Sequence, residues 1–291
     1  MMVSGIASTP EERGATLAFL RHLAAEVSAG TIDLPCFPDV VIRISTALAD
    51  PSTTTEQVVT IVGAEPRFAA RLLQTANSAA FNSSGKRTTD LRSAVTRLGH
   101  QMVQGIAMSY AVQLMRNEES LRSIAQPMAE LWNTSIAVAS ISRLIAQRTK
   151  VNPEEAFLTG LVHGIGSLYI MSRAAGQSNS VSNVQSWMDL LAGWHPSIGK
   201  AVLESWGFAE DLCEAVGDQR DYERKWKHQA VLTDVLIASL VLADALQTAE
   251  PRSIDTEGIN AFLSCGLTAA DCPAILAGAE SRIALVHEAL K

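Results

Sequence analysis

Apolar residues recur every three or four positions along most of the chain, as in residues 16–27, 40–49, 56–64 and 67–76. This spacing places apolar side chains on one face of an α-helix. The chain has no convincing run of alternating β-branched residues, and no Asn-Gly or Asp-Gly hairpin turn. We therefore predict an all-α, multi-helical protein.

Breaker and capping residues predict where the first helices begin and end. Pro38 leads into a helix over 39–49, which the Asp50-Pro51 pair ends because a residue before proline avoids the α region. Thr53 and Glu56 have the spacing of a capping box for the next short helix. Further helices are expected from Pro66 to Ala79, over 91–99 and over 100–115, with a loop at 82–90.

A polar stretch at residues 116–123 is the best candidate boundary. It divides the chain into an N-terminal helical subdomain, residues 1–120, and a second helical subdomain, residues 121–291. Residues 172–183 are expected to form a polar loop. The second part is predicted to contain longer helices over 124–149, 153–163, 184–193, 196–206, 209–219, 228–248 and 268–290.

Composition narrows the class of protein. Of the 291 residues, 47% are hydrophobic and the net charge is -7, which disfavours non-specific binding to nucleic-acid phosphates. The most apolar run, residues 231–246, contains Asp234 and Asp244 and is shorter than the roughly 20 residues of a membrane span. The N-terminus lacks the basic and apolar regions of a signal peptide. We expect a cytoplasmic protein that binds neither DNA nor membranes.

Four phrases in a fixed order resemble a known family. They are Leu34-Pro35 with Pro38, the Asp50-Pro51 break, "LLQTANSAAF" at 72–81 and "AFLTGLVHGIG" at 156–166. Together they resemble the HDOD family, the HD-related output domain of bacterial signalling proteins, over about residues 30–245. The resemblance implies an N-terminal helical bundle packed on a part derived from the HD phosphohydrolase fold. It also implies a regulatory, non-catalytic role with signalling proteins as partners.

The same resemblance indicates which metal ligands of active HD relatives are retained. Those enzymes hold one or two divalent metals with histidines and aspartates from several helices, and the metal activates a bound water. Of the ligand positions, His163, His195 and Asp244 are retained. The other three are altered: Thr134 stands for the first histidine, Gly164 for the aspartate of the His-Asp pair and Gln219 for a later histidine.

Three interpretations of the retained residues stay open. Two imidazoles and a carboxylate can in principle hold Zn²⁺ or Fe²⁺, so a weak divalent metal and a divergent phosphohydrolase (a phosphodiesterase) using His163, His195 and Asp244 form one alternative. A non-hydrolytic nucleotide sensor is another. Each residue also has a structural interpretation: His163 at a helix C-terminus, His195-Pro196 at a helix start, and Asp244 bonded to a buried partner. We expect a remnant site with no catalytic residue, no cofactor and no metal.

Two other motifs have simpler explanations. Residues 220–228, "RDYERKWKH", mix basic and aromatic side chains and are expected to form an exposed connector, with a partner surface as the alternative. Residues 94–108 have a helix–glycine–helix pattern, but the second helix carries no Arg or Lys to meet phosphates. Core packing is therefore the preferred interpretation of that helix.

Overall fold

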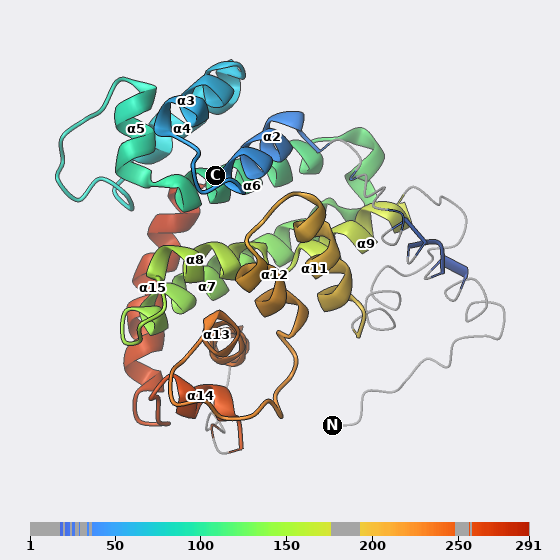
Figure 1. Ribbon diagram of the computed structural model, residues 1–291, viewed down its shortest axis with the longest axis vertical. Coiled ribbons are helices and arrows are strands. Elements are labelled where there is room, and N and C mark those ends of the chain that lie inside the picture. The colour runs from blue at the N-terminus through green and yellow to red at the C-terminus, as the bar shows by residue number, and fades with distance from the viewer. Residues whose placement is uncertain are drawn as a thin grey trace.

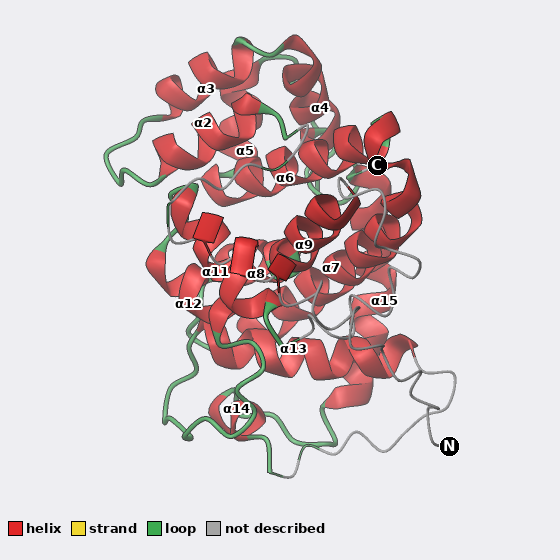
Figure 2. Ribbon diagram, turned by 90° about the vertical axis from the view of Figure 1, so that its right-hand side faces the viewer, coloured by secondary structure: helices red, strands yellow, loops and turns green. Residues whose placement is uncertain are grey.

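The computed structural model describes residues 18–175 apart from 20, 24, 27–28, 30–33 and 35–36, together with residues 193–247, 256 and 258–290. Within these ranges every regular element is a helix and no strand occurs, as Figure 2 shows. The all-α prediction is confirmed. The helices of the first part are α2 (Asp39–Leu48), α3 (Thr55–Gly63), α4 (Pro66–Ala76), α5 (Leu91–Leu98) and α6 (His100–Arg116).

Helix α3 begins with a capping box, one residue later than predicted. Thr54 is the N-cap: its hydroxyl accepts from the backbone N–H of Gln57, and the Gln57 side chain accepts from the backbone N–H of Thr54. Thr53 instead donates its hydroxyl to the carbonyl of Ala47 near the end of α2. The predicted pairing of Thr53 with Glu56 is therefore wrong, because Thr53 is already engaged with the preceding helix.

The second part begins with a short 3-10 helix, η1 (Glu119–Ile124), whose Leu121 and Ile124 are buried. The expected polar boundary at 116–123 thus contributes to the core. The remaining helices are α7 (Ala125–Ala146), α8 (Pro153–Val162), α9 (Ile165–Ala175), α11 (His195–Ser205), α12 (Glu210–Gly217), α13 (Leu232–Gln247), α14 (Asn260–Ser264) and α15 (Cys272–Ala289).

Helix α9 was not expected from the sequence. Its residues are buried almost without interruption, so it lacks the alternation of polar and apolar faces that reveals a surface helix. The polar loop predicted at 172–183 begins too early, since residues 172–175 belong to α9. Short α14 was also missed, and α15 begins at Cys272 instead of residue 268. The helix predicted over 184–193 lies outside the described residues except for Gly193, which is in a turn.

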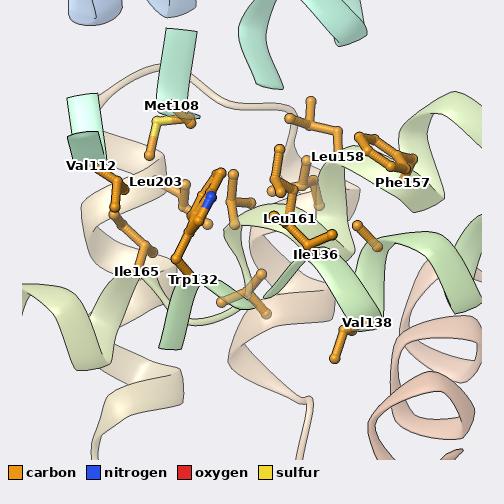
Figure 3. Close-up of a cluster of buried hydrophobic side chains, with 14 of the residues drawn as sticks. Met108, Val112, Trp132, Ile136, Val138, Phe157, Leu158, Leu161, Ile165 and Leu203 are labelled. Carbon is orange, nitrogen blue, oxygen red and sulfur yellow. The ribbon is translucent and has the colours of Figure 1, made fainter. Parts of the chain in front are cut away.

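Helices α7 and α8 lie side by side at the centre of the molecule (Figure 1). Burying a large apolar side chain contributes about 1.5–3 kcal/mol, so the core they share with their neighbours holds the fold together. This core is continuous across residue 120, and the subdomain boundary stays a prediction. Figure 3 shows Met108 and Val112 of α6, Trp132, Ile136 and Val138 of α7, Phe157, Leu158 and Leu161 of α8, Ile165 of α9 and Leu203 of α11.

The C-terminal helix α15 packs along α7 and returns to the N-terminal helices (Figure 1). The carbonyl of buried Leu290 accepts hydrogen bonds from the Ser109 hydroxyl at 2.8 Å and the Gln113 amide at 2.7 Å. The Thr75 hydroxyl donates to the carbonyl of Ala289 at 3.2 Å. Because Ser109 and Gln113 belong to α6 and Thr75 to α4, the chain end ties both parts of the fold together.

Two apolar helices are explained by packing. Helix α6 is buried from Met102 to Val112, so its apolar face forms core. Helix α13, which contains most of the apolar run at 231–246, is buried over most of its length. Among the described helices, none has both the length and the apolar character needed to cross a membrane.

Candidate functional site

A cavity of about 410 Å³ lies among α7, the α8–α9 junction, α11 and α13. All six positions singled out by the family resemblance line it, although they are spread over more than a hundred residues of sequence. Only the packing of these helices brings the six together. They are Thr134 in α7, His163 and Gly164 between α8 and α9, His195 at the start of α11, Gln219 after α12 and Asp244 in α13.

His163 is the C-cap residue of α8, in agreement with its expected place at a helix C-terminus. Its Nδ1 lies 2.8 Å from the carbonyl oxygen of Gly160. A carbonyl can only accept, so Nδ1 carries the proton and Nε2 keeps its lone pair. Burial lowers the pKa of His163, and the bond to Gly160 opposes this only in part. The imidazole is therefore neutral at neutral pH.

His195 opens α11, with Pro196 in its first turn, as the helix-start interpretation predicts. The residue is 9% exposed, and burial lowers the pKa of its imidazole to about 3. Neighbouring Arg220 and His163 shift this pKa in the same direction. Within the described part of the chain, Nδ1 of His195 is buried without a hydrogen-bond partner. The cavity therefore presents two neutral imidazoles from different helices.

Gln219 acts as a structural tie. Its side-chain amide donates to the carbonyl of His163 at 3.2 Å and to the carbonyl of Val216 at 2.7 Å. These bonds hold the segment after α12 against the α8–α9 junction. Gln219 is buried, with 1% of its surface exposed. Across the cavity, the Thr134 hydroxyl accepts from the side-chain amide of Gln247 at 3.0 Å. Two of the three altered positions thus make hydrogen bonds within the protein.

At Gly164 a packing contact occupies the space that a side chain would need. A Cβ placed on it would lie 2.7 Å from Cδ1 of Leu131, closer than carbon atoms can approach. Leu131 of α7 therefore fills the space into which a side chain at position 164 would extend. A carboxylate there would require the leucine to move first.

The residues present do not fit a bound divalent metal. His163, His195 and Asp244 line the same cavity, yet no group of three His, Cys, Asp or Glu side chains among the described residues is close enough to hold a metal ion. Thr134 and Gln219 offer a hydroxyl and an amide, which are weak ligands for transition metals beside imidazole, and Gly164 offers no ligand atom.

Arg220 and Tyr222 also line the cavity, although they were interpreted only as part of an exposed connector. The connector itself is as predicted: residues 220–228 lie between α12 and α13, and Tyr222 and Trp226 are 44% and 48% exposed. Trp226 makes an edge contact with His228 at a centroid distance of 4.2 Å and does not line the cavity. The only sequence signal that Arg220 lines the cavity is its position directly after Gln219.

Two glycines set the positions of the imidazoles. A Cβ on Gly160 would lie 2.6 Å from Cα of Ala139, so α8 packs directly on the backbone of α7. A Cβ on Gly166 would lie 2.0 Å from the carbonyl oxygen of His195 and 2.7 Å from the backbone nitrogen of Gly199. Helix α9 therefore touches the backbone of α11 where His195 begins.

Comparison with solved structures shows a shared fold. A candidate metal-dependent phosphohydrolase from Shewanella amazonensis SB2B is 24% identical with a TM-score of 0.72, covering 97% of this chain and 100% of that one. An HDOD domain protein of unknown function from Geobacter sulfurreducens is 24% identical with a TM-score of 0.63, covering 95% and 97%. A candidate signal transduction protein from Marinobacter aquaeolei VT8 is 18% identical with a TM-score of 0.62, covering 96% and 67%.

Sequence comparison assigns the family. An uncharacterized protein of Treponema pallidum (strain Nichols) is 22% identical over 205 residues, which span 67% of this chain and 39% of that protein. The chain thus spans about two-fifths of that relative's length. The HDOD domain model matches residues 34–222, which include five of the six cavity positions. The match covers more than half of the chain, and the chain belongs to the HDOD family.

Proposed function

We propose that this HDOD protein is a non-catalytic regulator that acts through contacts with signalling proteins. One observation carries the proposal: the cavity at the phosphohydrolase position retains two imidazoles, but Thr134, Gly164 and Gln219 supply no metal ligand. The family assignment and the name of the Marinobacter neighbour support a signalling role.

The lining of the cavity explains why hydrolysis is not expected. Metal-dependent phosphohydrolysis needs an activated water and positive charge on the phosphate oxygens. Here the His163 and His195 imidazoles are neutral, and the Gln219 amide is bonded to backbone carbonyls. Leu131 fills the space beside Gly164. The cavity wall provides packing and hydrogen bonds where an enzyme needs metal charge.

Metal analysis with an activity assay tests whether the protein is non-catalytic. The purified chain, incubated with Zn²⁺, Mn²⁺ or Fe²⁺ and then desalted, should retain metal well below one ion per chain and should not cleave cyclic dinucleotides. Stoichiometric metal together with turnover that His163→Ala abolishes would establish the divergent phosphohydrolase instead. His228→Ala is the matched control, since His228 is exposed and does not line the cavity.

Reconstitution with a partner tests the proposed contacts with signalling proteins. A protein captured from the native cell with the full chain should bind the purified chain directly, and Trp226→Ala should weaken that binding at least tenfold. Trp226 lies in the exposed basic and aromatic connector, where large aromatic side chains are frequent binding hot spots. Trp194→Ala is the control, because Trp194 is also exposed but precedes α11. Unchanged binding by Trp226→Ala would exclude this connector as the contact surface.

A second candidate function is binding of a small anionic effector such as a nucleotide in the same cavity. Arg220 and Tyr222 favour it, because a guanidinium can pair with phosphate and a phenol ring can stack on a base. A nucleotide that binds should raise the melting temperature of the wild type and leave that of Arg220→Ala unchanged. The absence of a shift across a panel of nucleotides would remove this candidate without affecting the proposed protein contacts.

A further inference from the structure

Exposed large apolar side chains are concentrated in two neighbouring segments of the chain. Among the described residues these side chains are Trp194, Tyr222, Trp226, Val231, Leu263 and Leu285. Three of them lie in the segment between α12 and α13, and Leu263 lies in α14, which Figure 1 shows at the lower end of the molecule. Single exposed apolar residues are common on proteins, whereas a group of them typically marks a contact surface.

The connector, residues 220–228, lies alongside α14. The backbone N–H of Lys227 donates to the hydroxyl of Ser264 at 3.2 Å. The side-chain amide of Asn260 donates to the carbonyl of Arg224 at 2.9 Å. Both ends of α14 are therefore hydrogen-bonded to the connector.

Trp226 and Leu263 belong to one surface. Trp226 lies in the connector directly before Lys227, and Leu263 lies in α14 directly before Ser264, to which Lys227 is bonded. Trp226 is 48% exposed and Leu263 is 60% exposed. We call these two residues, together with Lys225 and Lys227, the Trp226–Leu263 surface.

The Trp226–Leu263 surface is held in place by the protein itself. Nε of Arg224 lies 3.2 Å from Oδ1 of Asp234, whose side chain is completely buried. The ring of Trp226 packs edge-on against His228, with the ring centroids 4.2 Å apart. Phe262 is completely buried and anchors α14 in the core. A surface that is fixed in this way loses little conformational entropy when a partner binds.

The Trp226–Leu263 surface carries positive charge. Lys225 and Lys227 flank Trp226, and both are exposed. Neither forms an ion pair with another residue in the part of the chain that the structure describes. Lys227 also lines a groove with Asp211 and Glu214 of α12, but it pairs with neither of them. Helix α14 contributes no charged residue. The surface thus combines exposed apolar side chains with two unpaired ammonium groups.

A protein segment fits this surface better than a nucleic acid does. Leu263 is aliphatic, and its burial is favourable against an apolar side chain but not against a phosphate backbone. Asp221 and Glu223 of the same connector repel phosphates, as does the net charge of -7. Exposed tryptophan is among the side chains that most often dominate the binding energy of protein–protein interfaces.

We propose that the Trp226–Leu263 surface binds an acidic segment of a partner protein that carries apolar side chains on one face. This inference rests on the proposed regulatory function and names the contact surface and the chemistry of the partner. The apolar side chains of the segment cover Trp226 and Leu263, and its carboxylates pair with Lys225 and Lys227. Apolar contact supplies most of the affinity, and the charges supply specificity and a faster association.

Synthetic peptides test the chemistry of the partner. The probe is an amphipathic peptide of about 16 residues, with leucines on one face and glutamates on the other. The same peptide with glutamine in place of glutamate and single-stranded poly-U RNA serve as comparisons. At about 50 mM NaCl the full chain should bind the acidic peptide at least roughly tenfold more tightly than the glutamine peptide, and the difference should shrink at about 500 mM. Equal affinity for the two peptides would refute the charge assignment, and tighter binding of poly-U would replace the protein partner with a nucleic acid.

Matched apolar variants test the location. Trp226→Ala and Leu263→Ala should each weaken binding of the acidic peptide by about tenfold or more. Leu285→Ala is the control, because Leu285 is also exposed, at 47%, but lies in α15. If Leu263→Ala binds as tightly as the Leu285→Ala control, the proposed surface is wrong.

Charge variants test the role of the two lysines. Replacing both Lys225 and Lys227 by glutamine should abolish the preference for the acidic peptide over the glutamine peptide. The control replaces Lys86 and Arg87, an exposed basic pair in the loop between α4 and α5, by glutamine and should keep the preference. Equal loss in both double variants would show only general attraction by positive charge and would contradict a defined site.

Failure of this surface is distinguishable from failure of the proposed function. If the acidic peptide does not bind, while a purified partner binds the wild type and Trp226→Ala equally well, the regulatory function stands and this surface is wrong. Stoichiometric metal with turnover would remove the regulatory function, and peptide binding is measured independently of both.

Discussion

The helix backbones around His163 are tightly packed against one another, whereas the side chains that line the cavity beside it lack three of the six expected ligand groups. At Gly160 and Gly166 the backbones of neighbouring helices touch, with no room for a single added carbon. On the cavity side, Thr134, Gly164 and Gln219 carry none of the ligand groups that the HD resemblance associates with these positions. Packing of α7, α8, α9 and α11 does not depend on those groups. The arrangement of these helices is therefore compatible with a cavity that lacks the ligand groups.

The largest effect is expected at Gly166. A methyl group there would overlap the carbonyl of His195 and the backbone nitrogen of Gly199, neither of which can move without shifting α11. We expect Gly166→Ala to lower the free energy of unfolding by about 3 kcal/mol or more. Urea denaturation measures this.

Gly278→Ala in α15 is the matched control for that variant. An added Cβ there meets Leu144 at an ordinary 3.5 Å, and alanine favours a helix by up to about 1 kcal/mol over glycine. The control should be neutral or stabilising. A Gly166→Ala variant as stable as the control would show that the α9–α11 contact is not tight.

The next effect concerns acid stability through His195. Its pKa is about 3 in the folded protein and roughly 6.5 when unfolded, so the unfolded state binds more protons between these values. This contribution to stability is complete above pH 6.5 and is lost as the pH falls, at up to about 1.4 kcal/mol per pH unit. Urea denaturation between pH 7 and 5 should give a flatter stability profile for His195→Gln than for the wild type. Identical slopes would contradict burial of a neutral imidazole.

A smaller effect is expected at Gly164, where the obstacle is the flexible end of Leu131. Gly164→Ala should cost about 1–2 kcal/mol, because the leucine must change its rotamer. In a Leu131→Ala background the same substitution should cost much less, which a double-mutant cycle measures. Additive costs would mean that Leu131 does not occupy this space.

The smallest effect is expected at Thr134. Its hydroxyl accepts one hydrogen bond from Gln247 in an exposed setting, where a lost bond is replaced by water. Thr134→Ala should change the free energy of unfolding by less than about 0.5 kcal/mol, measured by urea denaturation. A loss above 2 kcal/mol would show that this part of the cavity wall is as constrained as the glycine contacts.

Local sequence signals predicted most helices but not all of them. Pro38, Pro66 and Pro196 stand at or next to helix starts. Proline suits the first turn because its φ is fixed near the helical value and its missing N–H is not needed there. Helix α9 escaped prediction because it is buried on all sides, which removes the periodic signal. The capping box of α3 shifted from Thr53 to Thr54 because α2 engages Thr53, a tertiary detail.

The sequence by itself determined the helical class and which metal-ligand groups are absent, since the identity of a threonine, a glycine or a glutamine at a position does not depend on folding. Only the tertiary structure decided that these positions share one cavity with Arg220 and Tyr222, and that His163, His195 and Asp244 do not converge on a point. It also decided that Leu131 fills the space at Gly164. Convergence depends on how helices distant in sequence pack, and no local pattern carries that information.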